Sequence, residues 1–295
     1  MRVEWPTVLV IVLCYLGWCL ALFLLPMIWL PLAIGLGAYT IALQSSLQHE
    51  VTHGHPFRAR RLNEAIVFAS LNLCIPFIRF RDMHLDHHLD SNLTDPYDDP
   101  ESNYLDSAVW TRLPRPLRII LMANNTLIGR LLLGPVVSQT AFMIGDWRQV
   151  RSGDRGVLRA WLWHVATIMP VLILVLVAPM PLWAYLLACY MGIAVLKIRT
   201  FLEHRAHDRA SGRTVIIEDQ GPLAFLFLNN NFHVVHHMHP RLPWYQIPAL
   251  YFSHKDRYLN RNDGYFYRSY AAIFRRHLFR PKDPVPHPLW SRTDL

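Results

Sequence analysis

Four apolar stretches dominate this chain of 295 residues. They cover residues 7–26, 27–47, 157–178 and 181–199. An apolar helix of about 20 residues spans the hydrocarbon layer of a bilayer. Prolines mark a turn within each pair of stretches, at Pro26 and Pro31 in the first pair and at Pro179 and Pro181 in the second. We therefore predict an all-α integral membrane protein with two transmembrane helical hairpins.

Composition supports membrane embedding and limits the classes of binding partner. Hydrophobic residues make up 53% of the chain, and the mean hydropathy is +0.18. A net charge of +8 is compatible with nucleic acid, anionic lipid or an acidic protein, and the apolar spans decide against nucleic acid. The four cysteines lie inside apolar runs without a C-x-x-C pair, so neither a disulfide framework nor a thiolate metal site is indicated.

Charge placement predicts which ends of the spans face the cytoplasm. The turns at Pro26–Pro31 and Ala178–Trp183 contain no charged residue. The opposite ends carry Arg58, Arg60, Arg61, Arg148, Arg151, Arg155, Arg159, Lys197 and Arg199. Because cytoplasmic loops carry an excess of Lys and Arg, we place these ends, and both termini, in the cytoplasm. The N-terminal stretch reads as a retained anchor, with a cleaved signal peptide as the alternative.

The remaining sequence is predicted to form a cytoplasmic helical cap. This cap covers residues 48–156 and 200–295, and the whole chain, 1–295, counts as one domain. The stretch 62–80 is apolar but interrupted by polar residues and a proline, and we expect it to be interfacial or partly buried. Residues 116–150 predict a helix lying on the membrane or a soluble helix packed on the cap. The acids of segment 95–100 are expected in a loop, solvated or structural.

Three histidine clusters recur where apolar sequence gives way to polar sequence. Their histidines are His49, His53, His84, His87, His88, His233, His236 and His237. Spacings of three and four bring side chains onto one face of a helix, and an even number of crossings places all three clusters on one side of the membrane. Imidazole suits Zn, Cu, Fe and Ni. Eight such ligands are too many for one ion, so the clusters predict a site for two.

Alternatives to this interpretation remain open. The first cluster also spells H-E-x-x-H through Glu50, the pattern of a zinc metalloprotease. That enzyme would need three ligands and would leave two clusters without a role. A metal sensor or store, or a catalytically silent relative, is a non-enzymatic alternative. Asp86 and Asp90 are candidates to accept the second imidazole N–H of a ligand, a common arrangement at metal sites.

The chain resembles the membrane fatty acid desaturase and hydroxylase superfamily, most closely the bacterial acyl desaturases. Its boxes H-x(3–4)-H, H-x(2–3)-H-H and H-x(2–3)-H-H are all present and in order. The resemblance implies four membrane helices under a cytoplasmic cap and two non-haem iron ions. It also implies O2 as co-substrate with two electrons. The expected reaction is desaturation of a fatty acyl chain, in a lipid or a thioester. Hydroxylation or another oxidation of a lipid or small metabolite is the alternative.

In structurally known relatives a ninth histidine follows the last membrane helix. His204 stands 29 residues before His233, directly after the final span, and the resemblance makes it the ninth ligand. His207 is the alternative. Thr200 stands where acyl-CoA desaturases have an asparagine at the metal centre, which is a departure from that branch. The residues predicted to support the ligands are Glu50, Asp86, Thr200, Glu203, His207 and Asn229.

The sequence also indicates how electrons arrive. Neither a His-Pro-Gly-Gly haem-binding segment nor a Rossmann-like G-x-G-x-x-G occurs in it. We therefore expect a separate carrier, ferredoxin-like or cytochrome b5-like, and the basic cytoplasmic face could bind an acidic carrier. The other expected partners are the lipid bilayer and a lipid or acyl substrate.

Overall fold

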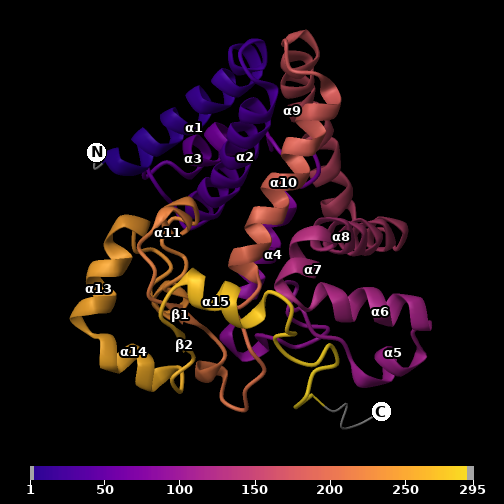
Figure 1. The fold of residues 1–295 in the computed structure, drawn as a ribbon, viewed down its shortest axis with the longest axis vertical. Helices are drawn as coiled ribbons and strands as arrows, with labels where there is room; N and C mark the ends of the chain where they lie inside the picture. The colour runs from indigo at the N-terminus through magenta and orange to yellow at the C-terminus, as the bar shows by residue number, and fades with distance from the viewer. Residues whose placement is uncertain (1–2, 291–295) are drawn as a thin grey trace. The chain divides into compact units, whose positions relative to one another are not determined.

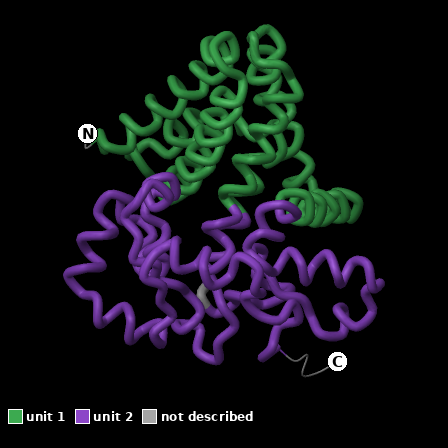
Figure 2. The backbone as a smooth tube through the Cα atoms, viewed as in Figure 1, with its two compact units in different colours: residues 1–82, 135–196 green, residues 83–134, 197–295 purple. Residues whose placement is uncertain are grey.

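The computed structural model describes residues 3–290, except for the side chain of Asp90. The described chain is mostly helical, as predicted (Figure 1). Within the described residues the only β-sheet has two strands of two residues each, β1 (Ile216–Ile217) and β2 (Phe266–Tyr267), which pair in parallel. Contacts divide the chain into two compact units, residues 1–82 with 135–196 and residues 83–134 with 197–295 (Figure 2).

Four helices are long and apolar enough to cross a membrane, as the sequence predicts. The candidate spans are α1 (Trp5–Phe23) with the short turn to Met27, α2 (Leu30–Thr52), α9 (Arg155–Val177) and α10 (Leu182–Thr200). The second span continues five residues beyond the predicted end at residue 47. The first histidine cluster therefore lies on the last turn of α2 and at its end, so helix geometry sets the spacing of its two imidazoles.

Side-chain packing holds the spans of the first unit together. Trp18, Ile41, Leu71 and Tyr185 belong to one buried apolar cluster. Tyr185 donates a hydrogen bond to the Leu71 carbonyl at 2.7 Å, and Trp18 donates to the Tyr185 hydroxyl at 3.3 Å. A Cβ at Gly192 would lie 2.9 Å from the Ala38 carbonyl oxygen, so glycine permits close approach of α10 and α2.

The stretch 62–80 does not form a span within the described residues. It divides into α3 (Arg60–Val67), an irregular segment and the start of α4 (Phe77–His87). Arg79 on α4 donates to Asp146 on α8 (Gly134–Arg151) at 2.9 Å, and Trp161 on α9 donates to the same carboxylate at 2.8 Å. Through the buried Asp146, these contacts join three helices of the first unit.

The helix expected over residues 116–150 is broken into three, which corrects that prediction. Its parts are α6 (Arg115–Asn124), α7 (Leu127–Leu132) and α8. Thr126 starts α7 by accepting a hydrogen bond from the Gly129 amide at 3.1 Å. A Cβ at Gly129 would lie 1.8 Å from the Ala123 carbonyl oxygen, so the chain turns back too closely for a continuous helix.

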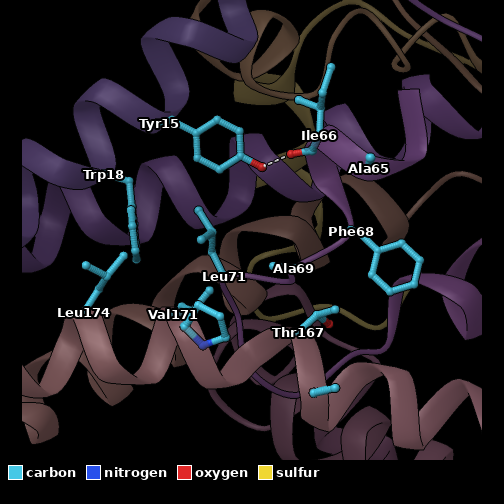
Figure 3. A pocket seen from close by; sticks show the side chains of 12 residues that line it. Tyr15, Trp18, Ala65, Ile66, Phe68, Ala69, Leu71, Thr167, Val171 and Leu174 are labelled. Carbon is cyan, nitrogen blue, oxygen red and sulfur yellow. Dashed lines mark hydrogen bonds between the residues drawn. The ribbon is translucent and has the colours of Figure 1, made fainter. Parts of the chain in front are cut away.

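The first unit also contains an apolar cavity of about 410 Å³ (Figure 3). Side chains from α1, from the end of α3 and the segment after it, and from α9 line it. Tyr15 lies at its wall, and its hydroxyl donates to the Ile66 carbonyl at 2.7 Å. The Tyr15 hydroxyl is therefore already hydrogen-bonded within the protein, and most of the cavity lining is apolar.

The second unit consists of short helices and loops. Its helices beyond α6 and α7 are α5 (Ser107–Arg112), α11 (Pro222–Leu226), α12 (His233–Met238), α13 (Ile247–Ser253), α14 (Lys255–Arg261) and α15 (Tyr270–His277). The buried residues Phe232, Val235, Tyr251 and Tyr258 form its apolar core. Val235 belongs to α12, so this core holds in place the helix that carries the third histidine cluster.

Candidate metal centre

Four histidines of the second unit bring their ring nitrogens together. They are His87 at the end of α4, His204 after α10, and His233 and His237 on α12, and one ligand atom from each lies within 4.8 Å of the others. The Nε2 of His204 lies 2.8 Å from that of His87 and 3.0 Å from that of His233. The Nε2 atoms of His233 and His237 are 3.2 Å apart. Three segments distant in sequence therefore converge on one point.

Three further histidines of the same unit form an adjoining group. The Nε2 of His88 lies 3.1 Å from the Nε2 atoms of both His84 and His236. The ring of His88 also stacks on that of His237, with ring centroids 4.5 Å apart. The second and third clusters thus supply ligand atoms to two neighbouring points, as a site for two ions requires.

The first cluster belongs to the other compact unit and is described by itself. His49 is buried on the last turn of α2, and His53 follows directly after the helix ends. Their rings lie edge to face with centroids 5.1 Å apart. His53 is the residue that directly follows the last turn of α2, four residues after His49, so the two imidazoles lie beside each other.

Neighbouring acids hold the second cluster. His87 Nδ1 lies 2.7 Å from Asp99 Oδ1, and His84 Nδ1 lies 3.0 Å from Glu101 Oε1. A carboxylate only accepts hydrogen bonds, so each Nδ1 must donate. The Nε2 of a neutral imidazole then carries a lone pair, and that lone pair points into the cluster. This arrangement fixes the tautomer that binds a metal.

An asparagine does the same for His233. Asn230 places its Oδ1 3.1 Å from His233 Nδ1, while its Nδ2 donates to Glu203 Oε1 at 2.9 Å. The bond to Glu203 orients the amide, so the oxygen must be the atom that faces His233. Burial raises the pKa of Glu203, and the nearby Arg199 works against this increase.

Ionisation favours a cation at the point where the four histidines meet. Burial lowers the pKa of His204 and His233 well below the usual value, and the neighbouring imidazoles lower it further, so both are neutral. Burial also lowers the pKa of His87, but Glu101 and Asp99 more than offset it and raise that pKa to about 9. A field that attracts a proton to His87 attracts a metal cation as well. Converging lone pairs and buried carboxylates fit the imidazole-rich sites of transition metals.

Among the predicted supporting residues, only some touch the histidines. Glu203 lies 3.9 Å from His233 Nδ1, whereas Asp86 is exposed on α4. The side chain of Asp90 lies outside the described residues. Asn229 donates to the Trp244 carbonyl instead. Thr200 is the last residue of α10.

His204 and His207 differ clearly in their surroundings. His204 lies among the histidines described above. His207 Nε2 faces Asp263 Oδ2 at 3.1 Å and its Nδ1 accepts from the Arg209 amide at 3.2 Å. Both ring nitrogens of His207 are therefore occupied by other partners.

Asp99, Glu101 and Asn230 contact ring nitrogens of the clustered histidines, and the sequence does not single them out. Asp99 lies in segment 95–100, whose acids are expected to be solvated or structural, and Glu101 directly follows that segment. Asp99 is buried, and its second oxygen accepts from the Thr94 amide at 2.8 Å, which closes the loop on itself. The only signal was two acids soon after a histidine cluster, and the turn that brings them back is not visible in a periodic pattern.

Taken together, the fold and the site define a mostly helical protein with four apolar helices and a histidine-rich centre suited to metal ions. A comparison with family models gives the particular family. The model described as fatty acid desaturase matches residues 24–269, and the chain therefore belongs to the fatty acid desaturase family. Membership implies an oxidoreductase that acts on fatty acids. A search of curated proteins found no match.

Proposed function

We propose that this protein is an O2-dependent di-iron desaturase that introduces a double bond into a fatty acyl chain carried as a lipid or a thioester. The observation that carries the proposal is the convergence of histidine lone pairs on two adjoining points in a member of the fatty acid desaturase family. Imidazoles are neutral ligands, so two bound irons would keep most of their charge and leave positions open for O2 and water.

The proposed ligand set contains nine histidines. Seven belong to the second unit, and His49 and His53 of α2 complete the set. The ligands are His49, His53, His84, His87, His88, His204, His233, His236 and His237. His204 is preferred to His207 because its Nε2 lies beside those of His87 and His233.

Bound iron would supply the oxidising power, with O2 and two electrons, that removal of hydrogen from an unactivated C–H bond requires. The residues of this chain prepare for that chemistry. Asp99, Glu101 and Asn230 hold three imidazoles in the metal-binding tautomer. Most of the histidines are buried, which limits side reactions with bulk water.

Topology and partners form the finer part of the proposal. The four candidate spans would form two hairpins, and the cap, both termini and the metal centre would lie on the cytoplasmic side. The support is the positive-inside pattern of Lys and Arg at the span ends. The chain would act as one membrane-bound domain, 1–295, and electrons would come from a separate ferredoxin-like or cytochrome b5-like carrier.

Comparative lipid profiling tests the reaction. Cells expressing the wild-type protein should contain acyl chains lighter by two hydrogens, and cells expressing His87→Ala should not. His207→Gln is the matched control, because His207 bonds to Asp263 away from the cluster, and it should retain the product. A hydroxylated product would replace desaturation by hydroxylation on the same scaffold. Unchanged products in His87→Ala would refute the role of the centre.

Metal analysis tests the cofactor separately. The purified protein should hold two iron ions per chain, and His87→Ala should hold fewer. One zinc ion and no iron would refute the di-iron proposal. In that case the H-E-x-x-H sequence around Glu50 would favour the zinc protease alternative.

A further inference from the structure

His204 differs from the histidines around it in how its ring is held. His84, His87 and His233 each place Nδ1 against a side-chain acceptor. The ring of His204 is partly buried, and its Nδ1 is a buried atom with no hydrogen-bond partner within residues 3–290. A ligand whose second nitrogen has no acceptor gains no orientation from that bond. Another part of the structure must therefore fix this imidazole.

The backbone around His204 is held on one edge by a neighbouring extended segment. The Glu203 carbonyl accepts from the Val215 amide at 3.1 Å, and the Arg205 amide donates to the Arg213 carbonyl at 2.9 Å. These bonds flank His204 but leave its own carbonyl pointing the other way, as expected where successive residues of an extended chain face opposite sides.

The opposite edge is held by two residues of the C-terminal segment. Lys282 Nζ donates to the His204 carbonyl, and only 7% of the Lys282 side chain is exposed. Asp283 accepts from the Tyr104 hydroxyl at 2.5 Å, and that hydroxyl in turn accepts from the Ala206 amide at 2.9 Å. The backbone that directly follows the His204 side chain, from the His204 carbonyl to the Ala206 amide, is thus tied to the pair Lys282–Asp283.

The C-terminal segment is itself fixed. The Leu105 amide donates to the Val285 carbonyl at 3.0 Å, and the His287 amide donates to the Leu105 carbonyl at 2.8 Å. Tyr104 and Leu105 follow directly after the loop that carries Asp99 and Glu101. One hydrogen-bonded strap therefore connects the acids of the second cluster with the backbone of His204.

We propose that Lys282, Asp283 and Tyr104 are positioning residues for the ninth ligand, and that they hold the His204 imidazole in place through its backbone. This inference rests on the proposed metal-binding function. It assigns the C-terminal segment a role at the centre, although none of its residues offers a metal ligand in the histidine groups described above.

Metal release to a chelator tests the proposal without relying on activity. Lys282→Met keeps the apolar stem and removes the donor, and Tyr104→Phe removes only the hydroxyl. Each should weaken the binding of one of the two irons about 10- to 100-fold, the range in affinity lost with groups that support a ligand, and the loss should be seen as faster release to the chelator. Lys255→Met is the control, because Lys255 pairs with Glu218 and should leave the release rates unchanged. If Lys282→Met does not fold, Tyr104→Phe carries the test alone.

A double-variant comparison separates positioning from a general loss of stability. His204→Gln should release the same iron quickly, and adding Lys282→Met or Tyr104→Phe should then have little further effect, because these residues act through His204. Additive losses would overturn the inference, and so would wild-type release rates in Lys282→Met and Tyr104→Phe. A wild-type protein that binds no metal would instead overturn the proposed function, and this inference with it.

Discussion

Replacing Asp99 by asparagine probes the tautomer of His87 with almost no change of shape. Asp99 Oδ1 accepts from His87 Nδ1 at 2.7 Å and from the Glu101 amide at 2.9 Å, and Oδ2 accepts from the Thr94 amide at 2.8 Å. Every partner of this carboxylate is therefore a donor. An asparagine must turn its own donor toward one of them, whichever way its amide is oriented.

The expected cost follows from these contacts. If the amide nitrogen faces His87, a donor meets a donor, and the imidazole is driven to the tautomer whose Nε2 carries the proton and cannot bind metal. If it faces Thr94, a buried amide loses its partner and the loop opens. Loss of such a supporting group lowers metal affinity about 10- to 100-fold, or about 1.4–2.7 kcal/mol. We expect Asp99→Asn to fall in this range.

The assay is metal content together with the rate of iron release to a chelator, measured on purified protein in detergent. Asp98→Asn is the control, because Asp98 is exposed in the same loop and its side chain contacts no histidine. Asp99→Asn with wild-type metal content and release rate would refute the argument that the carboxylate sets the ligand tautomer. An equal loss in Asp98→Asn would attribute the effect to the loop as a whole.

Four further predictions address ligand choice, stability and metal dependence. We expect His204→Gln to lose iron and His207→Gln to retain it, as measured by elemental analysis. Asp146→Asn should destabilise the first unit by about 3–5 kcal/mol, because it removes the charge that pairs with the largely buried Arg79 guanidinium. Tyr185→Phe should cost about 1–3 kcal/mol, because it removes one buried partner of a hydrogen-bond network. Removing the metal with a chelator should lower the melting temperature, since bound ions stabilise only the folded state.

Each of these expectations has a contrary outcome. If His207→Gln lost iron and His204→Gln retained it, His207 and not His204 would be the ninth ligand. An unchanged unfolding midpoint in Asp146→Asn or Tyr185→Phe would show that the buried networks contribute little to the first unit. A melting temperature that does not change on chelation would show that metal binding at the histidine centre does not stabilise the folded protein.

The spans and the histidine clusters could be predicted because their signals are local. An apolar run of about 20 residues has few alternatives to a membrane span, and the four candidate spans lie close to the predicted ranges. The broken helix over residues 116–150 could not be predicted in the same way. Its interruption depends on the close approach of Gly129 to the Ala123 carbonyl, and a hydrophobic pattern does not report such a contact.

The residues that support the ligands show the same division. Asp86 lies inside the second cluster and was the natural candidate, yet it is exposed because a helix turns successive side chains in different directions. Asp99 and Glu101 instead accept the hydrogen bonds of His87 and His84, from a loop that returns to the cluster. Asn230, and not its neighbour Asn229, faces a histidine, and a run of identical residues does not tell which one faces inward.

The sequence by itself predicted four candidate spans and located eight clustered histidines whose imidazoles suit transition metals, because helix length and residue spacing are properties of short segments. Only the tertiary structure decided which side chains hold the imidazoles and how His204 is fixed. Those contacts join residues far apart in the chain, such as His204 with Lys282, and they form only when several segments fold together. A hydrogen bond of this kind depends on position in space to a few tenths of an ångström, and a linear pattern carries no such information.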